Sequence, residues 1–368
     1  MTSDVDKDED LRMITGFSYF GISNPELAVN DFRRMREHHA NAVLLTLSEY
    51  ELEFNLENVR ELVARARGEG LLVYLNPWGV GNVFGGEPYS ALALKHSDQL
   101  QIDDRGDTAP AICPNSPVFH DYLKSWIEAT AICGPDIVMW DEPHFFLYHW
   151  YDEFASRSDR TTCYCARCRA LYAEQYGREM PAPPDDSVFE FRHRSLLKLL
   201  DWVSAEVRLA GMRNSVCILP PSLNWNGGIR NAEDVFQLRA MDIVGTDPYW
   251  QDETEPAKVE EAYRQNASLL AGLARKYGKE AEMWVQNFRI ARGDESLVEV
   301  ATHTSYRSGI RRILAWSFYG SAYMSYIRCE RPQAVFEAQS RAFAWCREQE
   351  ESAAEPADTG NLKNVRGE

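Results

Sequence analysis

The segment "IVMWDEP", residues 137–143, decides how the rest of the chain is interpreted. Four consecutive apolar residues, then two carboxylates and a proline, are typical of a strand that is buried on both faces and then leaves its sheet. Strands covered on both faces occur in parallel sheets with helices packed on each side. The segment therefore predicts an α/β fold in which Asp141 and Glu142 lie where a strand ends.

Seven other segments have the same character, a short apolar run that ends in polar or aromatic residues. They are residues 13–21, 42–49, 71–78, 215–222, 242–250, 282–288 and 312–320. Amphipathic helical patterns, such as residues 55–70 and 258–279, lie between them. Eight such units predict a closed (β/α)8 barrel, the TIM barrel. The alternative is an open doubly wound sheet, but no glycine-rich phosphate loop follows the first strand.

The barrel is expected to form one domain over residues 11–348, with a zinc-binding loop segment at residues 110–180. Polar, charged sequence predicts a disordered lead at residues 1–10 and a disordered tail at residues 349–368.

The composition excludes several classes of function. A net charge of −17 repels phosphate backbones, so we expect no nucleic acid partner and no docking on anionic membranes. No apolar run is long enough to cross a membrane. The acidic first residues, "MTSDVDKDEDLR", resemble neither a signal peptide nor a transit peptide, so a cytoplasmic protein is expected.

Catalytic groups of such barrels lie at the carboxyl ends of the strands. The side chains predicted there are carboxylates, amides and aromatic rings: Asn76, Trp78, Asp141, Glu142, His144, Asp247, Tyr249, Trp250, Gln286 and Trp316. Aromatic rings stack on the C–H faces of sugars, and amides and acids bind hydroxyl groups, so this set predicts a carbohydrate site. The alternative interpretation is that strand ends are polar wherever they meet water.

Cleavage of a glycosidic bond needs an acid that protonates the leaving oxygen and a second group that acts at the anomeric carbon. A neighbouring carboxylate and Trp140 are expected to raise the pKa of Glu142, which we predict to be the general acid. Asp141 and Asp247 compete for the second role. In a regular strand Asp141 and Glu142 point to opposite sides, but the turn at Pro143 can bring both to the cleft.

The barrel, the acid on the fourth strand and the aromatic eighth strand "LAWSFYG" resemble the large clan of retaining TIM-barrel glycoside hydrolases. In that clan a glutamate at the end of strand 7 is the nucleophile. Here Gln286 and Asn287 stand at that position, so the usual nucleophile is missing.

Two other activities stay open. The adjacent Asp-Glu pair is similar to the pair of hexosaminidases that act on 2-acetamido sugars. That resemblance implies that Asp141 orients the acetamido group, which attacks the anomeric carbon, while Glu142 is the acid. The last alternative is a barrel that binds glycans without cleaving them.

Four of the eight cysteines are clustered: Cys113 in "AICPNSP", and Cys163, Cys165 and Cys168 in a C-x-C-x-x-C run. Thiolates at this spacing can converge on one tetrahedral zinc ion. Free thiols or a redox pair are the alternative. The arrangement resembles the four-cysteine zinc site of family 42 β-galactosidases, although galactose specificity does not follow. Four thiolates leave no open position, so a structural Zn2+ is expected.

The carbohydrate substrate is the expected partner. Residues 145–151 of the aromatic insertion "HFFLYHWYDEF" form the segment that would face a second subunit if the chain formed a homo-oligomer.

Overall fold

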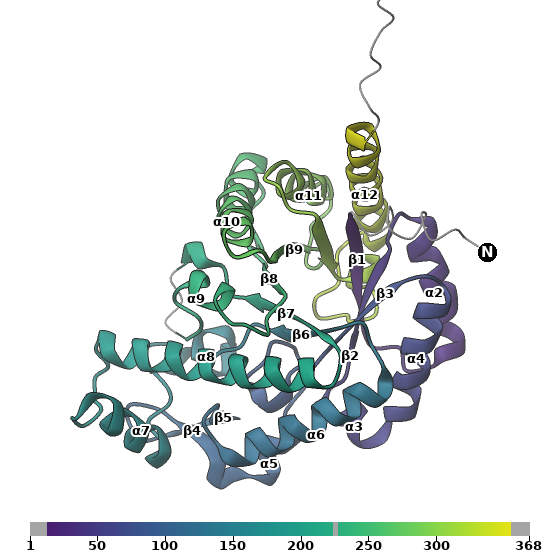
Figure 1. Cartoon of the computed structure of the whole chain (residues 1–368). Coiled ribbons are helices and arrows are strands. Elements are labelled where there is room, and N and C mark those ends of the chain that lie inside the picture. Colours follow the sequence, from purple (N-terminus) through teal and green to yellow (C-terminus); the bar gives the residue numbers. More distant parts are fainter. Residues whose placement is uncertain (1–12, 224–226, 355–368) are drawn as a thin grey trace, which may run out of the picture.

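A computed structural model of the chain describes residues 13–223 and 227–354 (Figure 1). The expected disordered lead at residues 1–10 lies outside the described residues, as does residue 355 onward of the expected tail. Within the described part, no helix has the length and apolar character that a membrane crossing requires.

Eight parallel strands close into a barrel, which confirms the predicted TIM barrel (Figure 1). They are β1 (Ile14–Tyr19), β2 (Ala42–Thr46), β3 (Leu72–Asn76), β6 (Ile137–Asp141), β7 (Arg213–Ile218), β8 (Ile243–Thr246), β9 (Glu280–Gln286) and β10 (Arg312–Trp316). Strand β1 closes the ring, because it pairs with β2 on one side and with β10 on the other. All eight segments expected to be strands contribute one.

Helices surround the barrel (Figure 1). The longer ones are α2 (Pro25–Glu37), α4 (Leu56–Gly68), α6 (Pro117–Cys133), α8 (Asp186–Leu209), α10 (Pro256–Tyr277), α11 (Leu297–Arg307) and α12 (Pro332–Ala354). Shorter ones are α3 (Glu49–Phe54), α5 (Ala91–Lys95), α7 (Ala166–Tyr176) and α9 (Ala232–Phe236). Helix α2 illustrates the local signals: Asn24 accepts hydrogen bonds from the first-turn amides and Pro25 opens the helix.

Helix α12 corrects one expected boundary. It continues to Ala354, so residues 349–354, expected to be disordered, are helical. The reason is a set of tertiary contacts that local composition cannot reveal. Glu350 accepts a hydrogen bond from the Tyr306 hydroxyl at 2.6 Å and pairs with Arg311 at 2.7 Å.

Strand alternation divides the core into two layers. Tyr74, Met139, Trp284 and Leu314 point into the barrel, whereas their neighbours along each strand pack against the helices. Side chains two residues further along each strand therefore also lie on the interior side, at the carboxyl end. This parity places Asn76, Asp141, Gln286 and Trp316 there.

The connection between β3 and β6 carries an antiparallel hairpin, β4 (Leu100–Ile102) and β5 (Thr108–Ile112). Phe146 and Tyr148 of the aromatic insertion pack with Ala109 and Ala111 of this hairpin. The insertion is thus held within its own chain at these two residues.

Candidate active site

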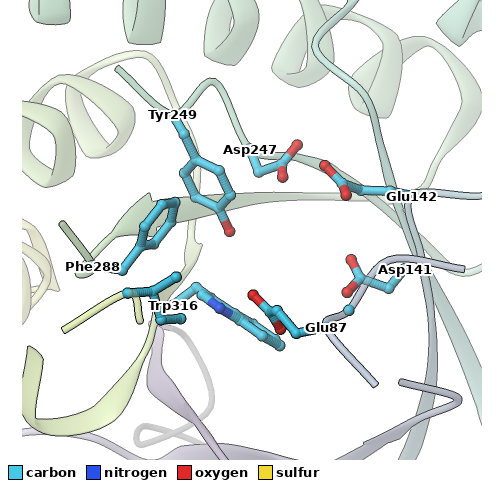
Figure 2. A pocket seen from close by; sticks show the side chains of 9 residues that line it. Glu87, Asp141, Glu142, Asp247, Tyr249, Phe288 and Trp316 are labelled. Atoms are coloured by element: carbon cyan, nitrogen blue, oxygen red, sulfur yellow. The ribbon is translucent and has the colours of Figure 1, made fainter. Parts of the chain in front are cut away.

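A pocket opens at the carboxyl end of the barrel strands (Figure 2). It contains about 420 Å³ of space free of protein atoms, its open mouth included. Its lining residues are Gly86, Glu87, Asp141, Glu142, Asp247, Tyr249, Phe288, Trp316 and Ile327. The pocket therefore brings together all three carboxylates expected from the sequence, with two of the expected aromatic residues.

Asp141 and Glu142 reach the same pocket by different means. Asp141 ends β6 and points inward by strand alternation. Glu142 has a φ of 37°, a left-handed conformation that is uncommon for a residue with a side chain. Its N–H still donates to the carbonyl of Cys217 at 2.9 Å, so the turn follows directly on the last rung of the sheet. This turn allows two consecutive carboxylates to share one cavity.

Figure 2 shows the carboxyl groups of Glu142 and Asp247 turned toward one another, and each acts on the pKa of the other. Burial raises the pKa of Glu142 well above its usual range, and the charge of Asp247 raises it further. Burial also raises the pKa of Asp247, to about 7, although the facing Glu142 acts in the opposite direction. Of the two acids, Glu142 is therefore the one whose protonated form is favoured more strongly.

The pKa of Asp141 also lies well above its usual range, because of burial and then the charges of Glu142 and Glu87.

Gly85 forms the wall behind both consecutive acids, Asp141 and Glu142. Its N–H donates to the carbonyl of Asp141 at 2.9 Å. A Cβ at Gly85 would lie 2.9 Å from Glu142 Oε2 and 3.1 Å from Asp141 Oδ2, so only glycine leaves room for both carboxyl groups.

Glu87 is a fourth carboxylate of the pocket, and sequence analysis missed it. It follows the glycine pair of "GGEP" in the loop after β3. The residue is exposed at the mouth, and its carboxyl group points into the cavity (Figure 2). Desolvation raises the pKa of Glu87 above its usual range, although the charge of Arg289 acts in the opposite direction. The glycine-rich loop after a barrel strand was the only signal in the sequence that could have indicated it.

Aromatic rings line the other side of the pocket (Figure 2). Phe20 lies between Trp316, at a centroid distance of 5.2 Å, and Trp78, at 5.0 Å. Tyr249 meets Phe288 edge to face at 5.0 Å. Of the expected aromatic residues, Tyr249 and Trp316 line the pocket, together with Phe288, which was not expected as a site residue. The expected Trp78 is not a lining residue and is connected to Trp316 through Phe20.

The remaining expected substrate contacts do not line the pocket. Gln286 accepts from the N–H of Gln251 and donates to backbone carbonyls, which ties the loop after β8 to β9. Trp250 packs outward on Tyr263 of α10 at 6.0 Å.

The other two expected contacts also lie behind the lining residues. His144 is buried, which lowers the pKa of its imidazole to about 4, and its Nδ1 bonds the carbonyl of Glu142 at 2.6 Å. Asn76 is fully buried, and neither polar atom of its amide has a hydrogen-bond partner among the described residues.

The four clustered cysteines converge as expected. Their sulfur atoms all lie within 4.8 Å of one another. Cys113 Sγ is 3.4 Å from that of Cys168 and 3.7 Å from that of Cys165. A tetrahedron of Zn–S bonds of about 2.3 Å has edges of about 3.8 Å, so the donor set and its spacing fit zinc. In the part of the chain that the structure describes, no second group of this kind is found.

No protein-family model and no curated protein sequence matches this chain. Solved structures with a similar fold exist. An endo-1,4-β-mannanase from Rhizomucor miehei superposes with a TM-score of 0.60 at 10% identity, covering 90% of this chain and 95% of that one. GH5_18 from Bifidobacterium longum subsp. longum, solved in complex with Manβ1-4GlcNAc, has a TM-score of 0.58 at 12% identity, covering 94% and 80%.

A third similar structure is the GH26 β-mannanase BoMan26A from Bacteroides ovatus, with a TM-score of 0.51 at 14% identity and coverage of 92% and 91%. At this level of identity the likeness shows the fold alone, because one fold serves many chemistries. Function must therefore be argued from the pocket.

Proposed function

We propose that this protein is a glycoside hydrolase that uses Glu142 as its general acid. One arrangement carries the proposal: Glu142, whose pKa is raised well above its usual range by burial and by the facing Asp247, lies in a pocket whose opposite wall is aromatic. A carboxyl group that stays protonated near neutral pH is what protonation of a leaving oxygen requires. The similar folds named above include mannanases, which agrees with a carbohydrate substrate.

The residues divide the work as follows. Trp316, with Phe20 behind it, provides a face on which a sugar ring stacks, and Tyr249 closes the end of the cavity. Glu142 gives its proton to the glycosidic oxygen as the bond to the anomeric carbon breaks. Asp247 faces Glu142 and raises its pKa, which favours the protonated form that a general acid needs. A second carboxylate then acts at the anomeric carbon.

A substrate-assisted mechanism is the second candidate, and two observations favour it. Asp141 lies beside the acid in the same pocket. The strand-7 position of the resembling clan is filled by Gln286, whose side chain is engaged with backbone groups. In this mechanism Asp141 holds a 2-acetamido group whose oxygen attacks the anomeric carbon. A barrel that binds glycans without cleavage is the rival from another class.

A panel of aryl glycosides that includes 2-acetamido sugars tests the proposal. The intact protein is expected to cleave at least one, and Glu142→Gln should lower kcat by about 10²- to 10⁴-fold while binding persists. Glu57→Gln, on the outer face of α4, is the matched control and should retain full activity. Absence of cleavage of every glycoside by the intact protein, with retained binding, would favour the non-catalytic barrel.

We propose further that the four cysteines hold a structural Zn2+. Bound there, the ion would cross-link Cys113, which follows β5, to the start of α7, and so fix one wall around the pocket. The surrounding charge supports this. Arg192 is buried and faces Cys163 and Cys168, and no described carboxylate lies within ion-pair distance of it. Two negative charges on a tetrathiolate site would provide the counter-charge that this guanidinium needs.

Metal analysis of the purified protein should find about one zinc per chain. Cys113→Ser should lose it and lower the melting temperature, because metal binding at such sites contributes to folding. Cys133→Ala, a buried cysteine of α6 outside the cluster, should retain the metal. Equal metal content in Cys113→Ser and the intact protein would contradict the assignment.

A further inference from the structure

We propose that Glu87 is the second catalytic carboxylate, the group that acts at the anomeric carbon while Glu142 protonates the leaving oxygen. The inference rests on the proposed hydrolase function and deepens it. It changes the assignment that the sequence suggests, because Glu87 stands in a loop and not at the end of a barrel strand.

The contact between Asp247 and Glu142 argues against Asp247 in this role. In glycosidases the acid and the second carboxylate flank the scissile bond, about 5–5.5 Å apart for direct attack and about 6.5–9.5 Å apart when water is activated. The carboxyl groups of Glu142 and Asp247 are turned directly toward one another, so this pair does not have the arrangement of two acids that flank a scissile bond. Figure 2 shows the Glu87 carboxyl group apart from this pair and on the side of the cavity nearer the Trp316 ring.

The charges around each acid favour Glu87 over Asp141. A nucleophile or base must be ionised. The charged groups that act on Asp141 are Glu142 and Glu87, both acidic, and they disfavour its ionisation. Burial raises the pKa of Glu87, but the positive charge of Arg289 acts in the opposite direction and favours its carboxylate form.

The loop that carries Glu87 is firmly tied. The Gly79 N–H donates to the carbonyl of Gly85 at 2.8 Å, and that of His144 donates to Val83 at 2.9 Å. A Cβ at Gly86 would lie 2.0 Å from the Trp78 ring, at a φ of 131°, so the chain passes tightly over the indole. These contacts fix the residue immediately before Glu87.

Glu49 anchors the other half of the same loop. Its carboxylate, at the carboxyl end of β2, accepts hydrogen bonds from Gly81 N at 2.8 Å, Ser90 Oγ at 2.7 Å and Leu92 N at 2.6 Å. Glu49 is thereby committed to positioning, and a buried carboxylate that holds both flanks of Glu87 is the support that a catalytic group on a loop needs.

The bonding changes are complete with these two residues and water. In direct attack, a bond forms between a Glu87 oxygen and the anomeric carbon as the glycosidic C–O bond breaks. The leaving oxygen takes that electron pair and the proton of Glu142. Water then attacks the anomeric carbon, gives its proton to Glu142 and frees Glu87. If a water molecule lies between Glu87 and the anomeric carbon, Glu87 instead removes a proton from that water as the water attacks the anomeric carbon. The anomer first released by the intact enzyme distinguishes the two courses.

The test uses Glu87→Ala and Glu87→Gln in the full chain, with the glycoside that the intact enzyme cleaves best. Both variants should lose about 10²- to 10⁴-fold in kcat with an unchanged melting temperature. Added azide or formate should restore part of the rate in Glu87→Ala, where the removed carboxylate leaves space, and not in Glu87→Gln. Tyr89→Ala, two residues away on the same loop and 91% exposed, is the control for loop disturbance and should stay within about threefold of the intact rate.

The outcomes separate the two levels of the proposal. If Glu87→Ala keeps its kcat while Glu142→Gln loses it, the assignment of Glu87 is wrong and the hydrolase function stands. A loss in Glu87→Ala that small anions do not relieve, matched by the same loss in Tyr89→Ala, reduces Glu87 to a loop residue and overturns the assignment. If no glycoside is cleaved by the intact protein, both proposals fail together.

Discussion

Acids lie inside the barrel at both of its ends, one at the amino end and four at the carboxyl end. At the amino end of β9, Glu282 accepts hydrogen bonds from Tyr74 at 2.8 Å, Trp284 at 3.0 Å and Ser215 at 3.3 Å. Arg312 lies close enough to counter the effect of burial on the pKa of Glu282. The pocket at the other end holds four carboxylates that mostly face one another.

This difference distinguishes an acid with a structural role, Glu282, from the pocket acids, which we propose to be catalytic. Burial raises the pKa of Glu282 too, but Arg312 and three hydrogen-bond donors act against that shift and favour its ionised form. For Asp141 and Glu142, burial raises the pKa and the charges of neighbouring acids raise it further. Such an arrangement destabilises the folded state and persists where it performs chemistry.

The largest expected effect is on the stability of the folded protein and concerns Glu282, at the end of the barrel opposite the pocket. Glu282→Ala removes the acceptor of three hydrogen bonds and leaves Arg312 without this partner. We expect a loss of about 3–5 kcal/mol in the free energy of unfolding. Denaturant unfolding measures it, with Glu142→Ala as the comparison, which should lose far less stability. Equal losses in both variants would remove the distinction between the two ends.

The second prediction concerns Asp247, whose pKa is raised to about 7 in the folded state. The unfolded chain releases this proton near pH 4, so between about pH 4 and 7 the folded state binds more protons and its stability falls as pH rises. Asp247→Asn removes this loss. The variant should gain about 1–4 kcal/mol relative to the intact protein between pH 4 and pH 8, since each pKa unit is worth about 1.4 kcal/mol.

Unfolding curves at the two pH values measure the gain from Asp247→Asn. A difference between variant and intact protein that does not change with pH would mean that Asp247 is not strained by its neighbours. In that case the pocket acids would resemble Glu282.

The third prediction has the smallest expected effect and concerns only the positions of the two consecutive acids. Gly85→Ala places a methyl group about 3 Å from both consecutive acids. Displacement of Glu142 should lower kcat by about 10- to 100-fold. Gly272→Ala, in α10 with no atom within 4 Å of its added Cβ, is the control and should leave kcat unchanged. Full activity in Gly85→Ala would show that Glu142 works in a position other than the one described.

The barrel and the cysteine site were accessible from the sequence because each depends on short-range patterns. A strand buried on both faces must be apolar along its length, and eight such runs separated by helices have few arrangements other than a closed barrel. The C-x-C-x-x-C run needs only a tight turn to bring three sulfur atoms together. Asp141 and Asp247 were recognised as pocket residues for a similar reason, since the carboxyl ends of all barrel strands meet at one mouth.

The sequence by itself thus determined the fold class, the pocket's end of the barrel and three of its four acids. Only the tertiary structure decided that Glu142 touches Asp247, that Gln286 and Trp250 turn to structural contacts, and that Glu87 enters the pocket. The physical reason is the sequence separation of the interactions involved. Periodicity reports which face of an element is buried, whereas the path of the loop with Glu87 depends on hydrogen bonds to Glu49 and His144, residues distant in sequence that no local pattern connects.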